Sequence, residues 1–172
     1  MSVKEILQLG NPKLWERSTP VEDPKSLSYL IQDLSDTLAA FREGRGYGRA
    51  IAAPQIGVQK RLVFVRMQGF CGAFINPEII SASDEKIELW DDCFSFPDLL
   101  VRVSRSLSIE VVYRDEAGSK QTIRASGDLS ELLQHEIDHL DGILAVQRAV
   151  SDKAFATRSE WERMILKASK ES

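Results

Sequence analysis

The sequence contains few residues of the types that form disulfides or bind transition metals. It has two histidines and two cysteines in 172 residues, and the histidines, His135 and His139, are only four positions apart. Cys71 and Cys93 allow at most one disulfide, which excludes a small disulfide-stapled scaffold. The first residues lack the apolar run of a signal peptide, so we expect a cytoplasmic protein with reduced thiols.

Long hydrophobic runs and an excess of positive charge are also lacking. No stretch is apolar enough to span a bilayer, so we expect no membrane partner. The 22 Lys and Arg residues against 26 Asp and Glu give a net charge of -4, which carries no direct nucleic-acid signature. Without repeats or a Ser/Gly linker, 172 residues predict a single domain over 1–172.

Hydrophobic spacing predicts helices at both ends of the chain and strands in its middle. Helical spacing runs through 25–42 and returns at 128–141 and about 151–168. Residues 61–66 and the short Phe74-Ile75 segment have strand character, and 107–125 suits a hairpin. Strands grouped between terminal helices predict an α+β domain rather than alternating βαβ units.

The two histidines belong to an H-E-x-x-H motif inside the predicted helix 128–141. Residues four apart lie one above the other on a helix, so the imidazoles of His135 and His139 can reach one ion. Glu136 lies at the edge of that face, within reach of a metal-bound water. Apolar residues on the opposite side predict a buried stripe at Leu133, Ile137, Leu140 and Leu144. The alternative is a chance spacing on a buried helix.

Two histidines leave a tetrahedral ion short of one protein ligand and one open position. A zincin-type protease would add a glutamate from a later helix, and Glu160 and Glu162 are candidates. A thiolate is also a strong ligand, which makes Cys93 the other candidate. For Cys71 we expect a buried, inert thiol. The residues alone leave the third ligand open.

Three segments decide between these alternatives by their order and spacing, which resemble the three motifs of peptide deformylases. They are Gly48-Arg49-Ala50-Ile51-Ala52-Ala53-Pro54-Gln55, Asp91-Asp92-Cys93-Phe94-Ser95 and Gln134-His135-Glu136-Ile137-Asp138-His139. Similar segments at 6–12, 74–77 and 139–142 extend the resemblance over about residues 5–150. It implies mainly antiparallel sheets around a central metal-binding helix, with N-terminal and C-terminal helices.

The resemblance also implies a function. One divalent ion, ferrous iron in the cell with zinc, nickel or cobalt as substitutes, would be bound by Cys93, His135 and His139. Glu136 would transfer protons, while the Gln55 amide and the Phe94 N–H would stabilise a developing oxyanion. The implied reaction is N-terminal processing during protein biosynthesis: removal of N-formyl groups from peptides or nascent proteins, with release of formate. The alternatives are a related amidase for another N-acyl substrate, a zincin protease, or a binding protein that kept the metal site.

The chain departs from the family pattern beside the implied substrate contacts, which are Gly48, Arg49, Ala50, Ile51 and Asp92. Family members usually carry Glu-Gly-Cys-Leu-Ser where this chain has Asp-Asp-Cys-Phe-Ser at 91–95. Ala50 stands where a glycine is usual, and Arg49 where an aliphatic residue is common. One interpretation is drift with local compensation; the other is an altered preference for polar or charged substrates.

The last predicted helix carries an amphipathic stripe, which is typical of core contacts. Its members are Trp161, Met164, Ile165 and Ala168. In the family this terminal region can face the ribosome, and Arg163, Lys167 and Lys170 are compatible with that. The expected partners are therefore an N-formylated peptide and the ribosome.

Overall fold

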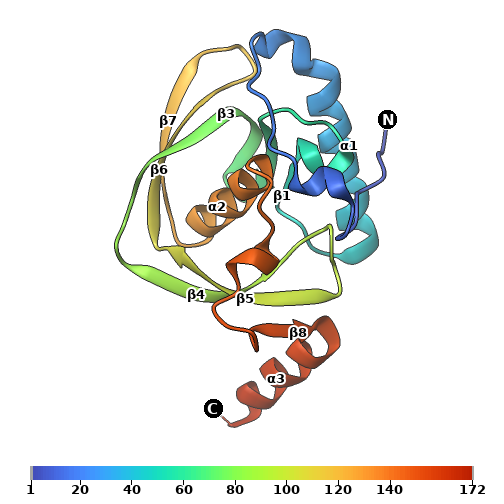
Figure 1. Cartoon of the computed structure of the whole chain (residues 1–172), viewed down its shortest axis with the longest axis vertical. Coiled ribbons are helices and arrows are strands. Elements are labelled where there is room, and N and C mark those ends of the chain that lie inside the picture. Colours follow the sequence, from blue (N-terminus) through green and yellow to red (C-terminus); the bar gives the residue numbers. More distant parts are fainter. Residues whose placement is uncertain (1, 172) are drawn as a thin grey trace.

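Two antiparallel sheets surround a central helix in the computed structural model, which describes residues 2–171, with side chains through residue 169 (Figure 1). The larger sheet has the order β1-β2-β3-β6-β7, with bounds Ala50–Ala52, Leu62–Met67, Phe70–Ala82, Ser108–Arg114 and Lys120–Ser126. The smaller has the order β4-β5-β8, with bounds Lys86–Asp92, Leu99–Ser106 and Phe155–Thr157. The helices are α1 (Ser28–Arg45), α2 (Asp128–Leu140) and α3 (Arg158–Glu171). The predicted α+β class with antiparallel sheets around a metal-motif helix is confirmed.

Strand β2 lies in a part of the larger sheet that is buried on both faces. Successive side chains of a strand point to opposite faces of the sheet. Leu62 and Phe64 accordingly pack in one core cluster with residues of α1, whereas Val63 and Val65 pack in another with residues of α2. All four side chains are buried. This part of the sheet is therefore held between α1 and α2, and the face toward α2 fixes the position of the metal-motif helix.

The smaller sheet closes the other side of α2. Val101 and Val103 of β5 pack in a third cluster with Leu144, which follows α2, and with Cys93, which follows β4. Both valines and Leu144 are fully buried. This cluster brings the end of β4 against α2 and so joins two sequence motifs that are about forty residues apart.

Most predicted elements are confirmed, but β3 is much longer than the two residues assigned to it. The predicted strand was confined to Phe74-Ile75, before Asn76-Pro77, and these bounds are wrong. The strand continues through a register shift between Ile75 and Glu78. Asn76 adopts a φ of 50°, and its side chain bonds the backbone N–H and C=O of Val21, both at 2.8 Å. Pro77 has no N–H to donate, and the bulge accommodates it without ending the strand.

The C-terminal segment also differs from the prediction. Helix α3 begins at Arg158 rather than near residue 151, because the preceding residues pair with β5 as strand β8. The expected core stripe is wrong for Met164 and Ile165, which are 40% and 50% exposed, and for Ala168, which is also exposed. Helix α3 instead projects from the body of the protein (Figure 1). The predicted contact residue Lys170 has its side chain outside the described part.

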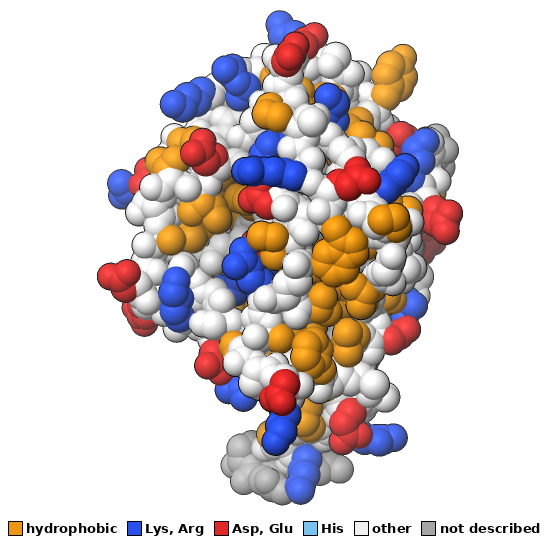
Figure 2. Space-filling model, in the orientation of Figure 1, with side chains coloured by type: hydrophobic (Ala, Val, Ile, Leu, Met, Phe, Trp, Pro, Cys, Tyr) orange, Lys and Arg blue, Asp and Glu red, His pale blue; other side chains and the backbone are white. Residues whose placement is uncertain are grey.

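The surface carries charges of both signs. On the face shown in Figure 2, basic and acidic side chains are intermixed, in keeping with the net charge of -4. Hydrophobic side chains gather in the lower right part of this face (Figure 2). Among residues 2–171, no helix has the length and apolar character needed to cross a membrane.

Candidate metal centre

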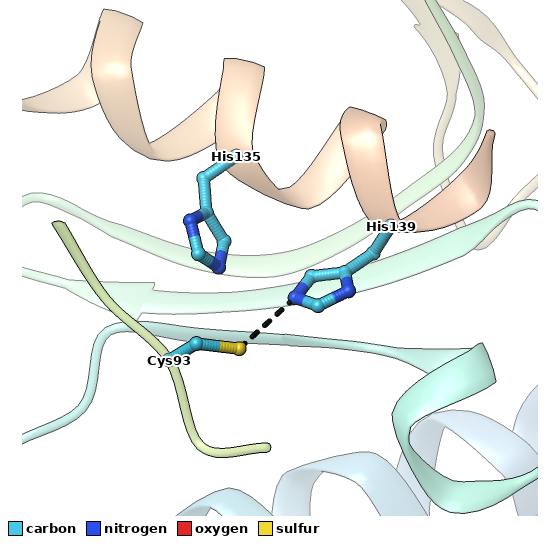
Figure 3. Close-up of side chains that lie close together, drawn as sticks. All are labelled: Cys93, His135 and His139. Atoms are coloured by element: carbon cyan, nitrogen blue, oxygen red, sulfur yellow. Dashed lines mark hydrogen bonds between the residues drawn. The ribbon is translucent and has the colours of Figure 1, made fainter. Parts of the chain in front are cut away.

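Three buried side chains, here called the triad, converge between α2 and the end of β4. Helix α2 presents His135 and His139 one turn apart, and Cys93 is the first residue after β4. Their ligand atoms all lie within 4.8 Å of one another, and Cys93 Sγ lies 3.2 Å from His139 Nε2. Figure 3 shows both rings and the sulfur directed toward a common space. No other such cluster occurs in the described part of the chain.

The triad fits a transition metal by its donor chemistry. One thiolate and two imidazoles form a set that binds zinc or iron and leaves a fourth position open. Burial lowers the pKa of His139 well below its usual value, and the nearby His135 adds to this effect. His139 is therefore neutral, which is the form of imidazole that binds a metal.

The competing candidates for the third ligand lie elsewhere. Glu160 and Glu162 are exposed on α3, and Glu160 forms a 2.9 Å ion pair with Arg163. Cys71 is exposed on β3, so the expectation that it is a buried thiol is wrong. In the sheet, Cys71 pairs with Arg66 of β2, and this pair lies away from α2. Glu160, Glu162 and Cys71 are therefore not members of the triad.

A buried ion-pair network orients the His135 ring by contacting the nitrogen that does not face the triad. The carboxylate of Asp91 lies 2.9 Å from His135 Nδ1, which leaves Nε2 for a metal. Arg105 donates to Asp91 at 3.0 Å and to Asp138 at 2.6 Å. Burial alone would raise the pKa of Asp91, but His135 and Arg105 outweigh it and hold the value at about 2. Burial would likewise lower the pKa of His135, and Asp91 instead raises it well above normal. Asp91 thus forms both contacts although it is shorter than the usual glutamate.

Replacing Asp91 with asparagine is expected to weaken metal binding by roughly ten- to a hundredfold, because His135 loses the anion that orients it and raises its basicity. The matched control is Glu88→Gln, which removes a carboxylate of the same strand that is half-exposed and paired with Arg102. Competition with a chromogenic chelator measures both affinities. Equal metal affinity in the Asp91 variant and the control would show that this network does not support the site.

Glu136 is buried beside the triad and carries an unpaired oxygen. Its Oε2 has no hydrogen-bond partner in the described structure, and the residue is 4% exposed. Burial raises its pKa to about 7, although the nearby His135 acts in the opposite direction. A carboxyl group with a pKa near neutrality is suited to accept and return a proton.

Gln55 and Phe94 flank the sulfur of Cys93. The Gln55 carbonyl oxygen accepts from the Ala52 N–H at 2.9 Å, while its Nε2 lies 3.5 Å from Cys93 Sγ. This arrangement fixes which side of the amide faces the triad. The Phe94 ring stacks on Phe41 of α1 with centroids 3.8 Å apart, and this packing accommodates the aromatic residue where leucine is usual.

The glycine of the first motif is required by the same ring. Gly48 has a φ of +130°, and a Cβ at this position would lie 2.7 Å from Phe94 Cζ. Any larger residue would therefore strain the backbone and displace the ring. Gly48 keeps the first motif in contact with the residue that follows Cys93.

A cavity of about 330 Å³ opens beside the triad. Gly48, Arg49, Ala50 and Asp92, four of the predicted substrate-binding residues, line it. The side chain of Ile51 is fully buried in the core and does not line the cavity, which leaves only its backbone for a substrate contact.

Two ion pairs in the cavity wall were not predicted. Arg49 pairs with Glu131 at 2.5 Å, and Asp92 pairs with Arg158 at 2.7 Å. The periodicity of α2 contains a signal for Glu131, because it precedes His135 by one turn on the same face. Arg158 has no local signal, because its partner lies in a strand 66 residues earlier.

Comparisons with known proteins agree with this geometry. The family model described as polypeptide deformylase matches residues 3–155. A peptide deformylase from Heliobacterium modesticaldum is 41% identical over 153 residues, covering 88% of this chain and 97% of the relative. One from Pseudothermotoga lettingae is 38% identical over 170 residues, covering 98% and 95%. The crystal structure of peptide deformylase from Thermotoga maritima matches with a TM-score of 0.82 at 30% identity, covering 88% of this chain and all of that one. This chain therefore belongs to the peptide deformylase family, the metal-dependent hydrolases that remove N-formyl groups from nascent peptides.

Proposed function

We propose that this chain, acting as one catalytic domain over residues 1–172, hydrolyses the formamide bond of N-formylated peptides with a divalent ion held by the triad. The observation that carries the proposal is the convergence of one sulfur and two ring nitrogens beside a cavity that also contains Glu136. We assign ferrous iron as the native ion, with zinc, nickel or cobalt as substitutes, since the same S/N donors accept each of them.

When bound, such an ion supplies Lewis-acid chemistry, because it lowers the pKa of water and polarises a carbonyl group. The Glu136 carboxylate then accepts the proton of the attacking water and delivers it to the leaving nitrogen, so that the products are formate and a free amine. The burial that raises the pKa of Glu136 to about 7 supports this double role. Asp91 keeps the His135 ring oriented throughout.

The oxygen of the formyl group becomes negatively charged as water adds to the carbonyl carbon. We assign its stabilisation to two N–H donors, the Gln55 side-chain amide and the Phe94 backbone. Preorganised donors of this kind are worth about 3–4 kcal/mol each in hydrolases. The position of Gln55 Nε2 beside Cys93 Sγ supports this role, since it places the amide donor next to the triad.

The substrate is proposed to contact Gly48, Arg49, Ala50 and Asp92 along the cavity, with Ile51 restricted to its backbone. The reaction belongs in the cytoplasm, where nascent chains emerge from the ribosome. Arg163 and Lys167, which are exposed on α3, are compatible with a ribosome contact there.

Formate release tests the function directly. Anaerobically prepared, iron-loaded protein is expected to turn over formyl-Met-Ala-Ser, and to prefer it to acetyl-Met-Ala-Ser by about a hundredfold, since a tight pocket discriminates one methyl group by up to that amount. A coupled formate assay and an amine assay measure the two reactions. Absence of formate release from the iron-loaded protein would contradict the proposal.

A second candidate, a deformylase-like amidase for another N-acyl substrate, is favoured by the two ion pairs in the cavity wall. Arg49 with Glu131 and Asp92 with Arg158 place charged, hydrogen-bonding groups in the cavity wall. Formylated amines with polar or charged substituents, assayed beside formyl-Met-Ala-Ser, distinguish the two candidates. The faster substrate class identifies the function.

A further inference from the structure

The start of α3 contributes an unassigned residue to the cavity wall. Strand β8 pairs with β5 from Leu99 to Val101, and Arg158, the next residue after β8, lies beside the segment that joins Cys93 to β5. The Arg158 N–H donates to the Asp98 carbonyl at 2.9 Å, which ties the first residue of α3 to that segment. Arg158 lines the cavity together with Trp161 from the next turn of the helix.

Three contacts hold the Arg158 guanidinium in one place. Its Nη2 donates to Asp92 Oδ2 at 2.7 Å, and its Nε donates to the Pro97 carbonyl at 2.8 Å. The guanidinium carbon lies 4.3 Å from the centre of the Tyr47 ring, which is a cation–π distance. The side chain is 20% exposed. A free arginine side chain loses conformational entropy when it binds a ligand. The three contacts already restrict the Arg158 side chain, so binding a ligand would cost less entropy.

The fixed guanidinium still has hydrogen-bonding capacity. Arginine carries five N–H donors, and the two bonds above use one on Nε and one on Nη2. The other three have no partner among the side chains that the structure describes, so they can serve a ligand in the cavity. Asp92 balances the positive charge of Arg158, so the pair as a whole suits a neutral acceptor better than a carboxylate. A main-chain carbonyl of a peptide is such an acceptor.

The ion pair of Arg158 and Asp92 lies where the part of a peptide substrate after its first residue would pass. Asp92 directly precedes the ligand Cys93, so the pair lies at the side of the cavity that adjoins the triad and continues to α3. A formyl group at the triad is attached to a chain that must leave through the cavity. The wall formed by Tyr47, Arg158 and Trp161 borders that path.

On the basis of the proposed function, we propose that Arg158 is a substrate-binding residue that donates hydrogen bonds to a main-chain carbonyl of the peptide after its first residue. Asp92 is then a positioning residue that holds Arg158 at the cavity. The glycine usual at this position in the family has no side chain to do so. The C-terminal helix thereby favours formylated peptides over formylated single amino acids.

The test compares two substrates, formyl-Met-Ala-Ser and formyl-methioninamide, which ends at the first residue. Arg158→Met keeps most of the side-chain stem and removes the donors. Its ratio of kcat/KM, tripeptide over amide, is expected to fall about tenfold, the effect of one lost hydrogen bond to a charged donor. Arg158→Lys keeps the charge but loses the forked donors, and its ratio is expected to lie between those of Arg158→Met and the wild type. The control is Arg163→Met on the same helix, in an exposed ion pair, and its ratio should stay within about twofold of the wild type.

Each outcome decides the proposal. A fall in the ratio for Arg158→Met but not for Arg163→Met supports it, and a smaller fall for Asp92→Asn supports the positioning role. Equal losses on both substrates would mean that Arg158 only maintains the structure, and an unchanged ratio would mean that it does not touch the peptide; either result overturns the proposal. Wild-type protein that releases formate from neither substrate would overturn the proposed function, and this proposal with it.

Discussion

A Cys93→Ala protein is expected to lose its metal and, with it, formate release. Binding of a metal to a four-ligand protein site is worth about 10–16 kcal/mol, so each ligand contributes roughly 2.5–4 kcal/mol. Removing the thiolate is therefore expected to weaken metal affinity by roughly a hundred- to a thousandfold. Metal per chain, measured by mass spectrometry after gel filtration, should fall well below one, and formate release should fall with it.

Cys71→Ala is the matched control, because it removes the other cysteine from an exposed position on β3. This variant should keep both its metal and its turnover. A Cys93→Ala protein that retains one tightly bound ion would contradict the assignment of the thiolate. It would instead direct attention to a carboxylate ligand, as the zincin interpretation required, although Glu160 and Glu162 are exposed on α3.

The sequence predicted the elements whose signals are local. Helix α2 was predicted almost to its observed bounds, because its apolar stripe and its two histidines follow one helical period. The long β3 was missed because Asn76-Pro77 normally marks a turn, and only the Val21 backbone, 55 residues away, satisfies the Asn76 side chain in the bulge. Strand β8 was assigned to a helix, because its three residues become a strand only through pairing with β5.

The candidate site follows the same division. The triad and Glu136 were predicted from sequence motifs. They come together once the chain adopts the predicted fold. The ion-pair partners were not predictable, since Arg105 and Arg158 come from β5 and α3 and meet Asp91 and Asp92 only in three dimensions. Neighbouring residues in β4 point to opposite faces. Asp91 therefore faces the buried network behind His135, while Asp92 faces the cavity.

This alternation gives the two departures beside Cys93 different structural consequences. Asp91 makes both the His135 and the Arg105 contacts, so the shorter carboxylate is accommodated within the metal site. Asp92 has a different consequence, because it binds an arginine of the C-terminal helix beside the cavity. The first departure keeps the contacts behind the triad, and the second adds an ion pair to the wall of the cavity.

Replacing Glu136 with glutamine is expected to leave the metal in place and to lower kcat by about a hundred- to ten-thousandfold, the contribution of a positioned general acid–base group. Glutamine has nearly the same shape, so the burial around it is kept, but its amide can neither accept the proton of water nor return it to the leaving nitrogen. Metal content and kcat for formyl-Met-Ala-Ser, measured on one preparation, separate the two effects.

The control for this variant is Glu160→Gln, which alters an exposed glutamate that pairs with Arg163 on its own helix. It should leave both quantities unchanged. Full turnover by the Glu136 variant would exclude the carboxylate as the proton carrier, even if the triad binds its ion as proposed. Loss of metal together with turnover would mean that Glu136 supports the ion rather than the proton transfer. Its unpaired, buried Oε2 favours the proton-transfer role, because a free carboxylate oxygen has no structural bond to lose.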